Sequence, residues 1–272
     1  MVQRTVCQVN GNPDLYGIGI RIGLYLQWVS TLLISIFIPK EVRTTRAVNL
    51  WIQSAIFLGL LLLVTSQDAT PAEVLIALWL LCGSLSSLTG NGMSSLAKLS
   101  GLFRIFFYIA LSSFGIWYWF VGLDGFLQPD CYVVAFFGNV SIDGRFRTLC
   151  KAVSCLGLAA CVASIGVWIA LVKSRAASEG DGQRPRAEMA RQPFRIEIGL
   201  LITSVALIIV SIAGVEYLIT TNEIQNVGDT LSVGQLIPLL AGSFSIASTA
   251  REVVTKDIFT KRRCWFLLGH HL

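Results

Sequence analysis

The chain has 272 residues, of which 54% are hydrophobic and only 14% are charged, and its formal net charge is +5. Soluble globular chains carry about 25% charged residues, so this composition excludes a disordered or collagen-like chain and nearly excludes a soluble enzyme. The basic residues lie in segments that follow long apolar runs, which indicates orientation in a membrane rather than a nucleic-acid-binding face. We therefore expect membrane lipids, and no nucleic acid, as partners.

Seven apolar stretches are long enough to cross about 30 Å of hydrocarbon as helices. Helices are expected because lipid offers the backbone no hydrogen-bonding partner, and the alternating pattern of barrel strands is absent. The predicted fold class is all-α: a polytopic membrane protein whose seven transmembrane helices form one domain, residues 1–250. The predicted spans are residues 17–39, 47–67, 71–90, 102–122, 149–172, 196–220 and 231–250. Residues 1–16 are polar, so no cleavable signal peptide is expected and the first span directs insertion.

The charge distribution predicts the orientation. With the N-terminus outside or lumenal and the C-terminus cytosolic, 16 of the 21 Lys and Arg residues fall in four inner segments, 40–46, 91–104, 173–195 and 251–263. The positive-inside rule favours this orientation over its reverse. Asn139 begins the sequence Asn-Val-Ser, the one N-glycosylation triplet in the chain, and it lies in the 123–148 loop that the charges place outside.

Three polar segments flank the spans. The outer loop 123–148 contains an apolar patch at residues 131–137, expected to form a hairpin or lid over the outer mouth, or to rest on the helix ends. The 173–195 segment is rich in polar residues with Gly and Pro, which predicts a flexible inner linker. Residues 251–272 predict a basic amphipathic cytosolic tail that lies on the inner leaflet.

The cysteines point to a disulfide and not to a metal. Cys7 and Cys131 lie on the expected outer side and Cys150 lies near it, so either Cys7–Cys131 or Cys131–Cys150 is a possible disulfide in an oxidising lumen. No CxxC or His/Cys spacing indicates a metal ligand set, and no nucleotide-binding or diphosphate-binding motif occurs. No metal and no cofactor are therefore expected.

Ionisable residues inside spans are costly and are the main candidates for function. Arg21 lies four residues inside the outer end of the first span, and Glu216 lies four residues inside that of the sixth, about 6 Å deep in each case. These two are the candidate catalytic residues. The candidate binding residues lie at a similar depth or in the loop above: Tyr25, Glu73, Asn222, Glu223 and Gln235.

Two interpretations of Arg21 and Glu216 stay open. In one, they form an ion pair that holds two helices together. In the other, they line a pocket in which Glu216 acts as a general acid and Arg21 stabilises charge. We expect the two side chains to face the bundle interior within ion-pair reach, because a charge that faced lipid alone would be costly. If they pair, Glu216 is a poor general acid until a substrate separates them; if they do not pair, the acid-catalyst interpretation gains.

Two familiar seven-span families lack their signature residues here. A microbial rhodopsin needs a lysine in the seventh span, and residues 231–250 contain none. A rhodopsin-like G-protein-coupled receptor carries DRY after the third span and NPxxY in the seventh. This chain has Thr89-Gly-Asn-Gly-Met and Gln235-Leu-Ile-Pro-Leu at those places, so both assignments fail.

One resemblance covers most of the chain. Residues 12–21 (NPDLYGIGIR) with 25–27, then Glu216 followed by 222–224 (NEI) and 234–238 (GQLIP), resemble poorly characterised multi-pass membrane proteins of filamentous fungi. That group implies no established activity. Some of its members of this size serve secondary-metabolite pathways, although the pattern of the seven-span terpene cyclases is not recognisable here.

Three classes of function follow as hypotheses. The first is a membrane-embedded enzyme or accessory protein that handles a lipophilic, terpenoid- or polyketide-like metabolite in a fungal biosynthetic pathway, and it requires an apolar cavity that reaches Glu216. The alternatives are a seven-span receptor or sensor, which requires inner-loop coupling, and a transport-associated protein, which requires a continuous polar path. The membrane is expected to be the endoplasmic reticulum or the plasma membrane.

Overall fold

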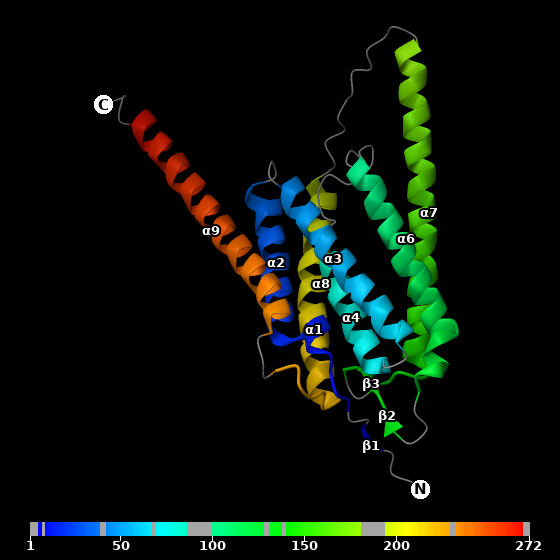
Figure 1. Cartoon of the computed structure of the whole chain (residues 1–272). Coiled ribbons are helices and arrows are strands. Elements are labelled where there is room, and N and C mark those ends of the chain that lie inside the picture. Colours follow the sequence, from blue (N-terminus) through cyan, green and yellow to red (C-terminus); the bar gives the residue numbers. More distant parts are fainter. Residues whose placement is uncertain are drawn as a thin grey trace.

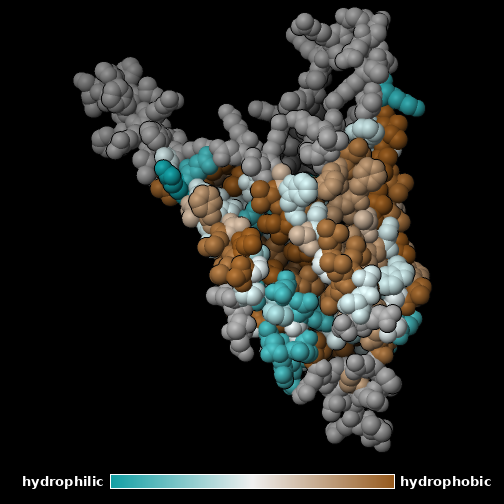
Figure 2. Space-filling view, in the orientation of Figure 1, coloured by the Kyte–Doolittle hydropathy of each residue, from teal (hydrophilic) through white to brown (hydrophobic). Residues whose placement is uncertain are grey.

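The protein is an all-α, multi-pass membrane protein. The computed structural model describes residues 5–6, 9–38, 42–66, 69–85, 99–127, 131–137, 140–180, 194–228 and 232–268. Six helical stretches in this part of the chain are long and apolar enough to cross a membrane: Pro13–Phe37, Ala47–Thr65, Leu102–Phe120, Arg145–Ala170, Leu201–Thr221 and Val233–Thr255. Hydrophobic residues cover the flank of the molecule and hydrophilic residues gather at its lower end (Figure 2). Such wide apolar exposure is what lipid contact requires.

The elements follow in chain order as shown in Figure 1. The N-terminal part contains β1 (Thr5–Val6), α1 (Pro13–Tyr16), α2 (Ile18–Phe37), α3 (Val42–Thr65) and α4 (Pro71–Ser84). The middle contains α6 (Leu99–Phe120), the 3-10 helix η2 (Gly122–Gly125) and the short strands β2 (Cys131–Tyr132), β3 (Val134–Phe136) and β4 (Val140–Ser141). The C-terminal part contains α7 (Arg145–Gly180), α8 (Phe194–Thr221) and α9 (Val233–Leu268).

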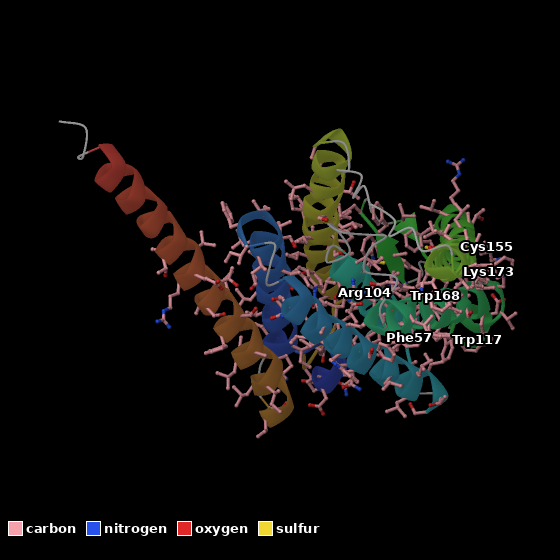
Figure 3. All side chains as sticks on the ribbon, turned by 90° about the horizontal axis from the view of Figure 1, so that it is seen from above. Phe57, Arg104, Trp117, Cys155, Trp168 and Lys173 are labelled. Carbon is pink, nitrogen blue, oxygen red and sulfur yellow. The ribbon has the colours of Figure 1, made fainter. Side chains whose placement is uncertain are left out.

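Helix α4 is the central helix of the bundle. It packs against α8 and α3 and also contacts α2, whereas α2 packs along α9 and α6 packs along α7. Seen along the bundle, α9 and the α6–α7 pair lie on opposite sides, with the labelled Trp117 and Trp168 on the α6–α7 side (Figure 3). Every residue from Pro71 to Ala77 of α4 is buried, so this helix has little or no contact with lipid along that stretch.

Two helices begin with caps that the sequence encodes. Asn12 accepts a hydrogen bond from the Asp14 amide at the start of α1, with proline at the first helical position. Thr70 and Glu73 form a reciprocal capping box at the start of α4, again followed by a proline. Both helices begin at the same end of the bundle, which we call the cap end because loop segments cover it (Figure 1).

The described parts of the 123–148 loop form much of this cover. Strand β3 pairs with β4 in an antiparallel hairpin, and β1 pairs with β2 in parallel. Val133, Val134 and Ala135 are buried, and β3 contacts α8 and α4. The hairpin therefore rests on the helix ends. The hairpin and the contact with the helix ends are alternatives in the expectation from the sequence, and the structure has both.

Helices α2 and α9 cross at very short range. A Cβ atom on Gly23 would lie 2.2 Å from the Pro238 carbonyl oxygen, and one on Gly242 would lie 2.2 Å from the Gly23 carbonyl oxygen. Further along the same contact, the Ser30 hydroxyl lies 2.7 Å from the Ser245 hydroxyl and 2.8 Å from that of Thr249. Glycines at the crossing let the backbones approach, and the hydroxyls then join the two helices.

Several boundaries differ from the sequence expectation. The expected linker 173–195 is helical up to Gly180, because α7 continues through residues that favour helix before the Gly- and Pro-rich stretch begins. Helix α9 likewise runs unbroken into the expected tail, since no glycine or proline lies between Gly242 and Gly269. The described part of the expected span 71–90 is the 14-residue α4, about 20 Å long and shorter than the hydrocarbon layer.

Candidate functional site

An ion pair joins α2 to α8 near the cap end. Arg21 donates from Nη1 to Oε2 of Glu216, and the hydroxyl of Tyr25 donates to Oε1 of the same carboxylate at 2.9 Å. Arg21 and Tyr25 lie one turn apart on α2, so both side chains reach the same neighbour. The predicted ion-pair contact between Arg21 and Glu216 is confirmed. We call Arg21, Tyr25 and Glu216 the carboxylate cluster.

The two charges of the cluster have different environments. The Arg21 side chain is 6% exposed, whereas that of Glu216 is 47% exposed. Glu216 belongs to a stripe of exposed residues along α8, with Ile209, Ala213 and Thr220 at helical spacing. It lies five residues before the last residue of α8, about 7.5 Å along the axis. The carboxylate therefore faces the apolar flank of the bundle, close to the polar boundary; only Arg21 faces the interior as expected.

The loop segments at the cap end, which we call the cap, cover Arg21 from that end of the bundle. The carbonyl oxygen of Val227, in the loop after α8, accepts a hydrogen bond from the Ile18 amide at 3.0 Å and one from Nη2 of Arg21 at 3.5 Å. The loop is tied to the N-terminal segment, since Gln225 bonds Val9 and Gly11 through its backbone at 3.0 and 3.1 Å. Nε of Arg21 is buried and has no hydrogen-bond acceptor in the described structure.

Gln235 caps a helix and does not join the carboxylate cluster. Its Oε1 accepts a hydrogen bond from the Gly19 amide at 3.2 Å, which is one of the amides left free at the start of α2. A Cβ on Gly17 would lie 2.5 Å from the Gln235 carboxamide. Gln235 is thus packed tightly against the N-terminus of α2, and its placement explains its 1% exposure.

Glu73 is likewise held in a separate network. The Tyr16 hydroxyl donates to its Oε1 at 2.9 Å, and the Thr70 amide and hydroxyl each donate to its Oε2 at 3.0 Å. These three donors satisfy a carboxylate that is 2% exposed. We assign Glu73 to the junction of α1 and α4 rather than to a ligand site.

Asn222 fixes the hairpin to α8. Its Oδ1 accepts from the Val134 amide at 2.9 Å and its Nδ2 donates to the Val134 carbonyl at 3.0 Å, with a further bond to the Leu218 carbonyl. The side chain therefore pairs with β3 as a neighbouring strand would. Glu223 follows it in the exposed loop, with a φ of 48°.

The structure decides one of the two disulfide pairings expected from the sequence. Cys131 is disulfide-bonded and Cys150 is a free thiol on α7, so the Cys131–Cys150 pairing is wrong. Cys150 lies in the second turn of α7, half-buried against the hydrophobic core. Cys7 and the glycosylation candidate Asn139 both lie outside the described residues, so the Cys7–Cys131 pairing and the glycosylation stay predictions.

Arg147 supplies an anchor that the sequence interpretation missed. It makes a two-pronged contact with Asp124, with distances of 2.6 and 2.9 Å, and donates from Nε to the Trp119 carbonyl at 2.8 Å. These hydrogen bonds hold the pKa of the Asp124 carboxyl below its usual value. The only signal in the sequence was that Arg147 is a basic residue on the expected outer side, which the positive-inside rule does not explain.

A buried polar cluster in the other half of the bundle was also missed. Gln53 donates to the carbonyl of Ser84, the last residue of α4, at 3.0 Å, and the Trp28 indole donates to the Ser84 hydroxyl at 2.9 Å. Asn49 is 0% exposed, and neither its carboxamide nor Oε1 of Gln53 has a partner in the described structure. The available signal was the four-residue spacing of Asn49 and Gln53 within an apolar run.

Comparison with known proteins leaves the chain without an assigned family. No protein-family model, no curated protein and no solved structure matches it. Among the described residues, no group of three or more His, Cys, Asp or Glu side chains is placed to hold a metal ion. The resemblance to fungal multi-pass membrane proteins thus stays a prediction, and function has to be inferred from the site.

Proposed function

We propose that the chain spans the membrane seven times, with the N-terminus and the cap on the outer or lumenal side and the C-terminus in the cytosol. The membrane is the endoplasmic reticulum or the plasma membrane. Two independent observations support this orientation. The inner segments hold 16 of the 21 basic residues, and the disulfide of Cys131 belongs to the cap, which fits an oxidising compartment.

Glycosylation tests the orientation. We expect the full chain, expressed in a eukaryotic cell, to carry one N-linked glycan at Asn139 and to shift in mobility on glycosidase treatment. Asn139→Gln should abolish the shift, because no other Asn-X-Ser/Thr triplet exists in the chain. A reporter fused after Leu272 should remain cytosolic in both proteins. A lumenal reporter would contradict the proposed orientation.

We propose further that the protein binds a lipophilic metabolite that reaches the carboxylate cluster from the lipid side. The observation that carries this proposal is the 47% exposure of the Glu216 side chain on an apolar flank, while its partner Arg21 is 6% exposed. The cap covers the end of the bundle above Arg21 through Val227. A ligand with an apolar body therefore has a lateral route to the carboxylate that keeps the body in lipid.

Binding is better supported than acid catalysis. A general acid needs a proton on the carboxyl group, whereas the Glu216 carboxylate accepts hydrogen bonds on both oxygens, from Arg21 and Tyr25. The cluster offers oriented acceptor atoms in an apolar setting, which are the fixed polar groups that orient a ligand in a mostly apolar site. This geometry supports the proposal of an accessory or carrier role in handling a metabolite.

Photo-crosslinking tests the binding site. The purified chain in liposomes is irradiated with a long-chain alcohol that carries a diazirine beside its head group, and labelled peptides are mapped by mass spectrometry. We expect labelling to concentrate on α2 and α8 around Ile22 and Ala213, and to be competed by an excess of the same alcohol without the diazirine. Labelling spread evenly over all lipid-facing helices, or insensitive to the competitor, would contradict a specific site.

A further inference from the structure

We infer that the ligand of the carboxylate cluster carries an uncharged hydroxyl head group, so that lipophilic alcohols are its chemical class. This inference rests on the proposed function and narrows it. It follows from which polar atoms of the cluster are still free to bond, from the net charge of the cluster, and from its depth.

The free hydrogen-bonding capacity of the cluster is almost entirely acceptor capacity. The two oxygens of a carboxylate offer about four lone-pair positions, and Glu216 uses one on Oε2 for Arg21 and one on Oε1 for Tyr25. The Tyr25 hydroxyl donates its hydrogen bond to Glu216, so it can offer a ligand only its oxygen lone pairs as acceptors. Arg21 has further N–H groups, among them the unpartnered Nε, but its side chain is only 6% exposed, so these donors are covered by protein. A ligand must therefore bring a donor.

The charge of the cluster selects against ionic donors and against acids. Arg21 and Glu216 sum to zero, so an ammonium head group would leave one uncompensated positive charge beside lipid, where charges are costly. A carboxylic acid head group in its ionised form would meet Glu216 as a like charge and would find no exposed donor. A hydroxyl group donates one hydrogen bond and brings no charge.

The position of Glu216 along α8 fits an amphipathic molecule. The carboxylate lies about 7.5 Å from the end of the helix, with Ile209 and Ala213 exposed on the same stripe toward the other half of the bundle. A molecule with its hydroxyl at Glu216 would lay its apolar body along this stripe. Hydrogen bonds to charged acceptors are stronger than neutral ones, which gives the hydroxyl a measurable share of the affinity.

The experiment compares head groups on one chain length. Competition against the photoactivatable alcohol is measured for hexadecanol, its methyl ether, hexadecylamine and palmitate, each at the same mole fraction in the liposome so that partitioning does not enter. We expect hexadecanol to compete about tenfold or more better than the methyl ether, the gain associated with one hydrogen bond to a charged group. The amine and the acid should compete more weakly than the alcohol.

Two variants locate the effect. In Tyr25→Phe the alcohol-to-ether ratio should fall severalfold, because Tyr25 orients the carboxylate and offers a second acceptor. In Arg21→Leu/Glu216→Leu, which removes both charges together and is therefore expected to fold, the ratio should approach one. Asp143→Asn is the matched control: it removes a carboxylate that lies 3.5 Å from Arg147 at the cap end, and the ratio should not change.

The outcomes separate this inference from the proposed function. Specific, competable labelling of α2 and α8 with equal competition by alcohol and ether would keep the binding site and overturn the hydroxyl. Stronger competition by the amine or the acid would overturn it as well. Loss of specific labelling in the unmodified protein would overturn both. A ratio unchanged in the double Leu variant would place the hydroxyl contact elsewhere and would contradict the inference.

Discussion

Replacing Gly23 by alanine is expected to force α2 and α9 apart and to lower the free energy of unfolding by about 3 kcal/mol, the upper part of the usual range for overpacking. The added Cβ would lie 2.2 Å from the Pro238 carbonyl oxygen and 2.4 Å from its carbonyl carbon. These are backbone atoms, so no side-chain rotation can relieve the overlap. Gly242→Ala should act similarly, because its Cβ would meet the Gly23 carbonyl at 2.2 Å.

The measurement is reversible unfolding of the purified protein in mixed micelles. Gly166→Ala on α7 is the matched control, since nothing lies within 4 Å of its added Cβ and alanine favours helix over glycine by about 1 kcal/mol. This control should be neutral or slightly more stable. Equal stability of Gly23→Ala and Gly166→Ala would show that the close crossing of α2 and α9 does not exist in the folded protein.

Replacing Glu216 alone by leucine is expected to cost about 3 kcal/mol of stability. The change leaves Arg21 as a buried cation without its partner, and breaking a buried pair on one side costs about 3–5 kcal/mol. The lower value applies because the Glu216 side chain is 47% exposed. The same unfolding measurement checks the result, together with the yield of folded protein after extraction.

The double variant Arg21→Leu/Glu216→Leu should recover most of that loss. Replacing both members of a buried pair by apolar residues removes the lone charge and is often neutral. The pairing predicts this non-additivity, with a coupling between the two sites of about 0.5–3 kcal/mol, the range for residues in contact. If the loss of stability in the double variant equals the sum of the losses in Arg21→Leu and Glu216→Leu, a contact between the two side chains is ruled out.

The sequence alone defined the membrane class and most of the helices. Apolar runs such as residues 102–122 and 196–220 became helices near their expected bounds, because a chain in lipid must satisfy its backbone within the segment. The starts of α1 and α4 were encoded as well, through Asn12 and Thr70 with the prolines that follow them. These are local properties that a short window of sequence contains.

The Arg21–Glu216 contact was predictable for a different reason. A charge inside a span is so costly that it needs a partner, and only a few opposite charges lie at the same depth. Depth could be counted from the span ends, so the pair could be found without knowing which helices are neighbours. The direction in which Glu216 points could not be counted in this way, because it depends on how α8 is rotated against α2 and α4.

Only the tertiary structure decided the partners of the other polar residues. Gln235, Glu73 and Asn222 lie near the predicted depth, yet they bond Gly19, Tyr16 and Val134, which come from three different segments. The same holds for the close crossing at Gly23 and for the buried Asn49. Residue type and spacing set what a side chain can donate or accept, whereas its partner is set by the packing of helices that are distant in sequence.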